Sequence, residues 1–227
     1  MSSTIARPAV SLVELGPLAQ LRAGRLWRRL SQLVVGLVLY GVSLGMMVRA
    51  DLGLAPWDVL HSGVVRFLPI TLGQAVIAMS FVVLLAWVPL RETPGVGTVL
   101  NALLVGSAAD LTLMTLGRPD GSAARWALTI GGVLLCGAAS ALYIGAQLGR
   151  GPRDGLMTGL VRRTGWSLRA VRTGIEVSVV LIGLALGGVL GVGTVLYALA
   201  IGPLTQALLP RCTVALPASR GISGGSR

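Results

Sequence analysis

Residues 95–100 read GVGTVL, and residues 191–196 read GVGTVL again. The second GVGTVL begins 96 residues after the first. With the same shift of 96 residues, residues 41–111 align with residues 137–207 without a gap, and 23 of the 71 aligned positions are identical. A second block keeps the same register, because LGLAPWD at residues 52–58 returns as LGRGPRD at residues 148–154. Self-similarity at one fixed shift is the signature of a duplicated structural unit. The chain therefore contains two copies of one unit.

Long apolar segments fill both copies. Hydrophobic residues make up 54% of the chain and charged residues 12%, whereas soluble domains carry about 25% charged residues. A helix needs about 20 mostly apolar residues to cross the hydrocarbon core. We therefore predict an all-α polytopic membrane protein with six transmembrane helices, over residues 30–48, 72–88, 96–116, 126–146, 173–190 and 192–209.

Two shorter segments, residues 56–68 and 152–164, are too short and too polar to cross. Each follows a glycine turn and begins with Pro, which suits the first position of a helix. We interpret both as short helices that lie at the membrane interface or re-enter the membrane. The predicted organisation is a cytoplasmic N-terminal arm, a first three-span repeat, a second three-span repeat and a flexible C-terminal tail, over residues 1–29, 30–118, 125–210 and 211–227.

The basic residues predict the orientation. All nineteen are Arg, and cytoplasmic loops carry an excess of basic residues. With the N-terminus in the cytoplasm, the outer segments hold only four, namely Arg49, Arg66, Arg118 and Arg125. We therefore predict that both termini are cytoplasmic. Because each repeat has an odd number of spans, the second copy begins on the opposite side of the membrane, and the repeats are inverted.

Inverted repeats are typical of secondary transporters. The leading hypothesis is therefore a small-solute transporter or permease with its site between the repeats. The alternative is a non-transporting membrane scaffold or accessory protein that acts through a partner, and the Arg-rich segment 150–172 is the feature that favours it. The expected surroundings are the lipid bilayer rather than nucleic acid, because the net charge of +11 resides in loops between apolar runs.

No nucleophile–base pair, Walker loop or dinucleotide fingerprint occurs in the chain. We therefore expect no enzymatic activity, no catalytic residue and no cofactor. The chain has one His and two Cys, and Cys136 and Cys212 are too far apart for a metal-ligand spacing. We expect no metal site.

The most informative candidate site residues lie in the two Pro-containing blocks. Pro56 and Pro152 at the first helical position place Asp58 and Asp154 at the third, where a carboxylate can cap free backbone N–H groups. Alternatively, two re-entrant helices bring both carboxylates toward the membrane midplane, where they bind a cation, a proton or a substrate ammonium group. If the carboxylates are neutralised, the same helix ends favour an anion. The sequence therefore leaves open whether the substrate is a cation or an anion.

Other polar side chains join the candidates. Asp110 and Glu176 lie inside predicted spans, where a charge is costly. Arg172, one turn before Glu176, offers it an ion pair, whereas Asp110 has no local partner and is a proton-relay candidate. His61, one turn after Asp58, either pairs with it or is an ordinary interfacial histidine.

The remaining candidates belong to glycine-rich segments. Thr98 and Thr194 in the GVGT blocks can bond their own backbone or a neighbouring helix, with packing as the expected role. Gly41-x-x-x-Gly45, Gly183-x-x-x-Gly187 and Gly187-x-x-x-Gly191 fit close helix contacts within the chain, or a homodimer through glycine-rich helix faces.

The segment 45–63, with LGLAPWDVLHSG at its centre, resembles the YczE/YyaS/YitT family of bacterial integral membrane proteins. The resemblance extends over about residues 30–210 and includes a following T-x-G, here at residues 71–73, and a weaker second copy. It is closer to the YczE branch, because the soluble C-terminal domain of YitT-like members is absent. It implies a multi-pass protein of the bacterial cytoplasmic (inner) membrane, and it implies no substrate. The first copy's Trp57 is Arg153 in the second, which departs from a symmetric pair of blocks.

Overall fold

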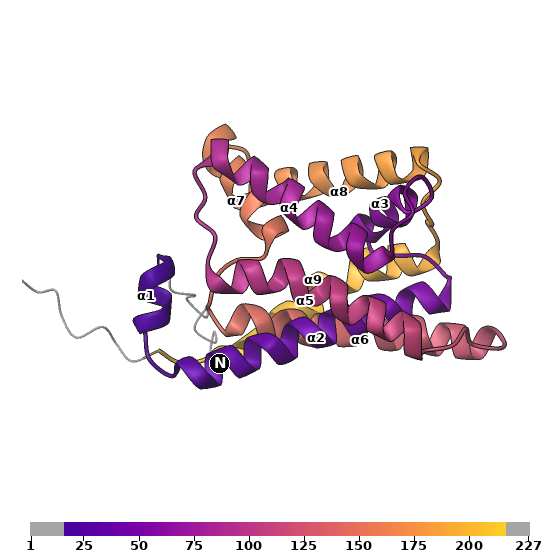
Figure 1. Ribbon diagram of the computed structural model, residues 1–227, viewed down its shortest axis with the longest axis horizontal. Helices are drawn as coiled ribbons and strands as arrows, with labels where there is room; N and C mark the ends of the chain where they lie inside the picture. Colours follow the sequence, from indigo (N-terminus) through magenta and orange to yellow (C-terminus); the bar gives the residue numbers. More distant parts are fainter. Residues whose placement is uncertain (1–15, 217–227) are drawn as a thin grey trace, which may run out of the picture.

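The computed structural model describes residues 16–216, and these residues form helices and no strand (Figure 1). The predicted all-α class is confirmed. Parts of the predicted N-terminal arm and C-terminal tail lie outside the described residues. The helices are α1 (Pro17–Arg22), α2 (Leu26–Ala50), α3 (Pro56–Val64), α4 (Leu72–Leu90), α5 (Val96–Thr115), α6 (Ser122–Gly145), α7 (Pro152–Thr164), α8 (Leu168–Ala185) and α9 (Val192–Cys212).

Five of the described helices, α2, α4, α5, α6 and α9, are long and apolar enough to cross a membrane. Helix α8 is not among them, because its 18 residues include Arg169, Arg172 and Glu176. The predicted span 173–190 is therefore not confirmed. Helix α8 begins and ends earlier than predicted, at Leu168 and Ala185. Gly187, just beyond it, has a φ of +77°, which a helix cannot contain.

The helix starts repeat along the chain. Helices α2, α3, α4 and α5 begin at residues 26, 56, 72 and 96, and α6, α7, α8 and α9 begin at residues 122, 152, 168 and 192. Each start in the second half is the first-half number plus 96. The register found in the sequence is therefore also the register of the helices.

Helices α2 and α6 pack against each other at the centre, with α5 beside α2 and α9 beside α6. In Figure 1 these four helices occupy the lower part of the view, and α3, α4, α7 and α8 occupy the upper part. The short helices α3 and α7 lie toward opposite ends of the molecule, with α3 on the right and α7 on the left. Helix α3 packs against α8, and α7 packs against α4.

Two arginines tie α2 and α6 together. Arg29 donates from Nε to the Ala146 carbonyl at 2.8 Å and from Nη2 to the Gln147 carbonyl at 2.5 Å. Arg125, 96 residues later, donates from Nε to the Ala50 carbonyl at 2.7 Å. A cation near the last carbonyls of a helix satisfies free acceptors and complements the helix dipole. The start of each helix therefore lies beside the end of the other, and the two helices are antiparallel.

The same contact revises the role of one residue. Arg29 belongs to the predicted cytoplasmic arm, but it lies in the first turn of α2 and its side chain is buried. Buried arginines are retained where their donors have acceptors, and the carbonyls at the end of α6 supply them. Arg29 therefore contributes to helix packing as well as to the count of basic residues on one side.

The two GVGT blocks each bind the glycine loop of the other half. Gly97 N donates to the Leu148 carbonyl at 2.8 Å, and Gly193 N donates to the Leu52 carbonyl at 2.7 Å. The loop glycines, Gly53 and Gly149, have φ values of +119° and +124°, a conformation that glycine adopts at little cost. The most strongly conserved features of the internal repeat therefore form the contact between its copies.

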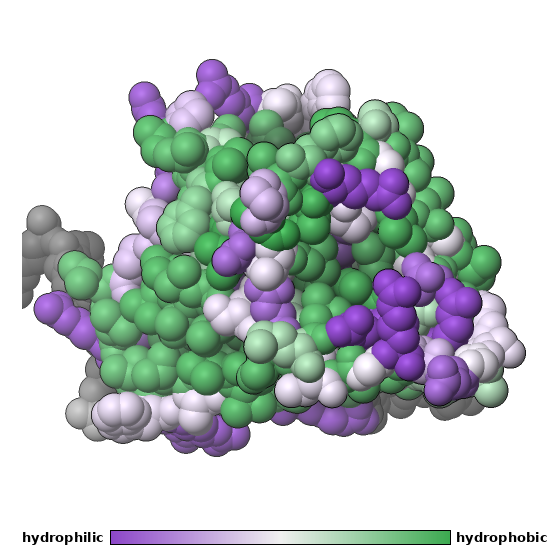
Figure 2. Space-filling view, turned by 45° about the vertical axis from the view of Figure 1, so that its right-hand side comes forward, coloured by the Kyte–Doolittle hydropathy of each residue, from purple (hydrophilic) through white to green (hydrophobic). Residues whose placement is uncertain are grey.

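The glycine pairs also pack within the chain. A Cβ added at Gly41 would lie 2.4 Å from the Val105 carbonyl oxygen of α5, and one added at Gly45 would lie 2.6 Å from the Thr112 side chain. This face of α2 is therefore occupied by α5. The outside of the molecule is largely apolar, as the broad green area in Figure 2 shows, and Leu85, Val88 and Leu199 are at least 70% exposed. Such a surface is typical of contact with lipid.

Candidate functional site

The N-terminal ends of α3 and α7 meet inside the molecule. Pro56 and Pro152 begin the two helices. The guanidinium carbon of Arg153 lies 4.9 Å from the ring centroid of Trp57. These two residues are 96 positions apart, so each occupies the other's position in its own repeat. A residue that contacts its own repeat equivalent lies where the two copies meet.

A cavity of about 200 Å³ lies at this meeting point, and we call it the central cavity. Its lining includes Trp57 from α3, Arg153 and Asp154 from α7, and Glu176 from α8. The three tyrosines of the chain, Tyr40, Tyr143 and Tyr197, line it as well. The Tyr40 and Tyr197 hydroxyls are 3.5 Å apart. Charged and phenolic side chains thus gather between apolar helices.

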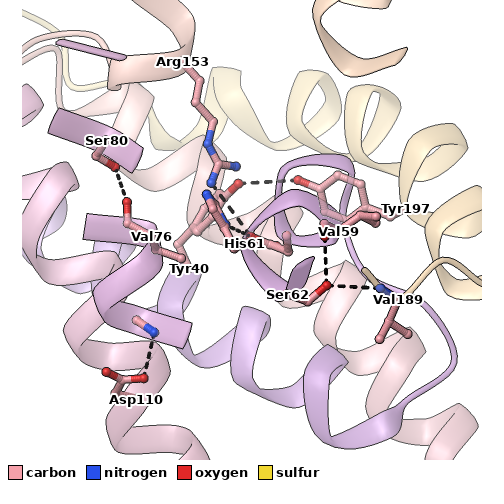
Figure 3. A network of polar contacts seen from close by, with 12 residues as sticks. Tyr40, Val59, His61, Ser62, Val76, Ser80, Asp110, Arg153, Val189 and Tyr197 are labelled. Atoms are coloured by element: carbon pink, nitrogen blue, oxygen red, sulfur yellow. Dashed lines mark hydrogen bonds and ion pairs between the residues drawn. The ribbon is translucent and has the colours of Figure 1, made fainter. Parts of the chain in front are cut away.

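Asp58 and His61 form a buried pair beside this cavity. The Nδ1 atom of His61 lies 3.0 Å from Oδ1 of Asp58, and the side chains are 1% and 7% exposed. The Nη2 atom of Arg153 is 3.8 Å from the same Asp58 oxygen. Figure 3 shows the Arg153 side chain directed toward His61 and the hydroxyl groups of Tyr40 and Tyr197. One cation from α7 therefore faces one carboxylate from α3.

Asp154 separates the central cavity from a larger one. The larger cavity has a volume of about 500 Å³, includes Trp87, Gln147 and Thr158 in its lining, and is called the inner cavity below. Asp154 and Tyr143 line both cavities. The Tyr143 hydroxyl donates a hydrogen bond of 2.9 Å to Oδ2 of Asp154. A single carboxylate thus borders two adjoining spaces.

The predicted ion pair on α8 is present, because Nε of Arg172 lies 2.9 Å from Oε1 of Glu176. Both side chains line the central cavity, and Gly202, Thr205 and Gln206 of α9 line it too. The cavity therefore lies between α8 and α9, two described helices that do not pack closely together.

The corresponding helices of the first half are in close contact. A Cβ added at Gly73 of α4 would lie 2.1 Å from the Gly106 carbonyl oxygen of α5. In the second half Arg169 takes the place of Gly73, 96 residues later. An arginine cannot approach the neighbouring helix backbone as closely as a glycine. The opening between α8 and α9 is therefore encoded in the sequence.

Three predicted site residues lie away from the central cavity. Asp110 accepts hydrogen bonds from the Thr71 hydroxyl and, at 2.8 Å, from Gly73 N. It therefore caps the start of α4, with partners that are distant in sequence. Thr98 and Thr194 accept hydrogen bonds from Gly95 N at 3.1 Å and Gly191 N at 3.3 Å, so both stabilise helix starts.

Sequence reasoning missed the tyrosines and the role of Arg153. The rarity of tyrosine was the available signal, because the chain has only three and all of them line one cavity. Within residues 16–216, no three His, Cys, Asp or Glu side chains gather in a way that could hold a metal ion.

Comparisons with known proteins agree with this architecture but supply no activity. Residues 27–210 match the model of a family of unknown function, DUF6198. An uncharacterised protein of Haemophilus influenzae is 38% identical over 183 residues, which cover 81% of this chain and 84% of the relative. An uncharacterised membrane protein of Bacillus subtilis, YczE, is 34% identical over 176 residues, which cover 76% and 80%. No solved structure matches the chain. The resemblance to YczE-like membrane proteins is therefore confirmed, and the chain belongs to the DUF6198 family.

Proposed function

We propose that this membrane protein is a small-solute transporter or permease whose substrate site is the central cavity. The observation that carries the proposal is the meeting of α3 and α7, one from each repeat, at Trp57 and Arg153. Ionisable side chains within a membrane protein are costly, and they usually mark a substrate or ion pathway. Short helices that end near the midplane, between two repeats, are a recurrent way to build such a site.

The proposed topology has six crossings, with α8 as the sixth. The ion pair between Arg172 and Glu176 lowers the cost of placing the charges of α8 in the membrane. Each repeat then contributes three crossings and one short helix, and the repeats are inverted, with both termini cytoplasmic. The antiparallel packing of α2 and α6, which are equivalent in the two repeats, supports this arrangement.

In this topology the inner cavity faces the cytoplasm, because Arg150 and Arg162, which line it, belong to the Arg-rich segment 150–172. A solute would pass from the inner cavity to the central cavity beside Asp154, which borders both. The gap between α8 and α9 offers a second approach from the side of Arg172 and Glu176. The tight contact of Gly73 with Gly106 closes the corresponding route in the first half.

Uptake into proteoliposomes tests the proposal. The purified protein is reconstituted, and a panel of radiolabelled small organic anions, cations and neutral solutes is offered. We expect at least one solute to accumulate above the level in protein-free liposomes. Asp154→Asn should reduce that uptake about tenfold or more, because it removes a charge that borders both cavities.

Asp120→Asn is the matched control, because it makes the same chemical change in an exposed loop, and it should leave uptake unchanged. A protein that moves no solute of the panel, but co-purifies with one partner, would instead support the scaffold or accessory role. Equal uptake by the two variants would exclude Asp154 from the pathway.

A further inference from the structure

The donors and acceptors of the central cavity point to the chemistry of its ligand. Resting on the transport role proposed above, we propose that the substrate is a small solute with a carboxylate group, and that Arg153 and Trp57 bind this group. The inference concerns the sign of the ligand's charge, which the paired Asp residues alone leave open.

Arg153 has unused hydrogen-bonding capacity. A guanidinium group carries five N–H donors, yet no described residue accepts a hydrogen bond from Arg153. Its ion-pair partner, Oδ1 of Asp58, is 3.8 Å from Nη2, beyond the usual range for a hydrogen bond. The planar arrangement of these donors matches a carboxylate, which can accept two parallel hydrogen bonds. Arg153 is therefore available to a ligand.

The carboxylates around the cavity are already partnered. Asp58 is held by His61 at 3.0 Å, Asp154 by Tyr143 at 2.9 Å and Glu176 by Arg172 at 2.9 Å. A ligand cation would add a further partner to carboxylates whose charge is already partly compensated. A ligand carboxylate would instead use the free donors of Arg153, so the cavity favours an acceptor group over a donor group.

Trp57 supplies a second unused donor. Its Nε1 atom is buried and has no hydrogen-bond partner among the described residues, and the side chain lines the central cavity. A buried donor without a partner lowers stability, so its presence calls for an explanation. Its ring lies beside the Arg153 guanidinium, so a side-chain movement that uncovers the N–H would bring both donors to one carboxylate group.

The size of the central cavity limits the solute. A volume of about 200 Å³ corresponds to roughly seven water molecules at about 30 Å³ each. Pockets for drug-sized ligands are larger, at about 300–1,000 Å³. The cavity therefore suits a carboxylic acid of a few carbon atoms.

Calorimetry on the purified full-length protein in detergent tests the assignment with three-carbon probes that differ in the head group. The probes are propionate, propionamide and propylammonium, with inorganic phosphate as a second oxyanion. We expect propionate to bind at least about tenfold more tightly than the other three, because a charge-assisted hydrogen bond accounts for about one such factor. Tighter binding of propionamide, propylammonium or phosphate would overturn the inference.

Two variants locate the site. Trp57→Phe keeps the aromatic ring and removes the N–H, and Arg153→Lys keeps the charge and removes the planar fork. Each should weaken propionate binding about tenfold. Trp57→Phe should not lower the unfolding temperature without ligand, because the N–H has no partner to lose. A purely structural Trp57 would give a lower unfolding temperature and unchanged binding of propionate, which would contradict the assignment.

The matched controls are Trp166→Phe and Arg118→Lys, both at exposed positions, and neither should alter propionate binding. The binding assay needs no transport, so the two proposals can fail separately. Propionate binding by a protein that accumulates no solute of the uptake panel would refute the transport role and leave the carboxylate site. Uptake of a cation, with no propionate binding, would refute the carboxylate site and leave the transport role.

Discussion

Gly191→Ala is expected to destabilise the protein by about 3 kcal/mol or more, because it inserts a side chain between the backbones of the two repeats. A Cβ at this position would lie 2.3 Å from the carbonyl oxygen of Leu52 and 2.8 Å from its carbonyl carbon. The φ of Gly191 is −169°, which alanine also adopts, so the cost comes from the close approach alone. Relieving it would pull Gly193 N away from the Leu52 carbonyl, now 2.7 Å distant.

The result can be read from the unfolding midpoint in detergent and from the yield of monodisperse protein. Native domains are stable by only about 5–15 kcal/mol, so a loss of this size should reduce the yield severely. Gly174→Ala is the matched control, because nothing lies within 4 Å of the added Cβ and the position is inside helix α8. It should be neutral or gain about 0.5–1 kcal/mol. Equal midpoints for the two variants would refute the proposed contact.

Arg153→Met is expected to cost about 3 kcal/mol, because it leaves the buried Asp58 carboxylate without its cation. Asp58 is 7% exposed and lies 3.8 Å from Arg153. Adding Asp58→Asn to the same chain should recover most of the loss, because the uncompensated charge is then removed as well. The two single variants and the double variant form a cycle, and we expect a coupling energy of more than about 1 kcal/mol.

The pair Arg172 and Glu176 is the matched control for this cycle. Its side chains are 47% and 29% exposed and line the central cavity at the opening between α8 and α9, where water screens the pair, so we expect it to contribute less than about 1 kcal/mol. Arg172→Met with Glu176→Gln should therefore show a small coupling energy. If the Arg153 cycle gave a coupling no larger than this one, Asp58 and Arg153 would not act as a buried pair.

The internal repeat made most of the helix pattern predictable. Pro56 and Pro152 mark the starts of two helices because proline suits the first helical position. The bounds of α8 were less accessible, because its first turns are charged through Arg169 and Arg172 and its apolar run continues past its end to Gly187. A hydrophobicity pattern alone therefore places the end of this helix too late in the sequence.

The partners of the polar residues could not be predicted from local spacing. Asp110 had no local partner, yet it caps α4 through Thr71 and Gly73, residues that precede it by 39 and 37 positions. Trp57 and Arg153 seemed to break the symmetry of the two blocks. In the folded chain they contact each other, and both line the central cavity. Contacts of this kind join residues that are distant in the sequence. They depend on how the two copies pack, which cannot be inferred from local residue spacing.

Cysteine labelling from the two sides of the membrane tests the proposed inversion of the repeats most directly. Leu68 and Thr164 occupy equivalent positions in the two repeats and are exposed. Leu68 follows α3, and Thr164 is the last residue of α7. Each is replaced by Cys in a chain that carries Cys136→Ser and Cys212→Ser. A membrane-impermeant maleimide should label position 68 in right-side-out vesicles and position 164 in inverted vesicles. Labelling of both positions from the same side would contradict the inverted arrangement, and with it the proposed site between two opposed halves.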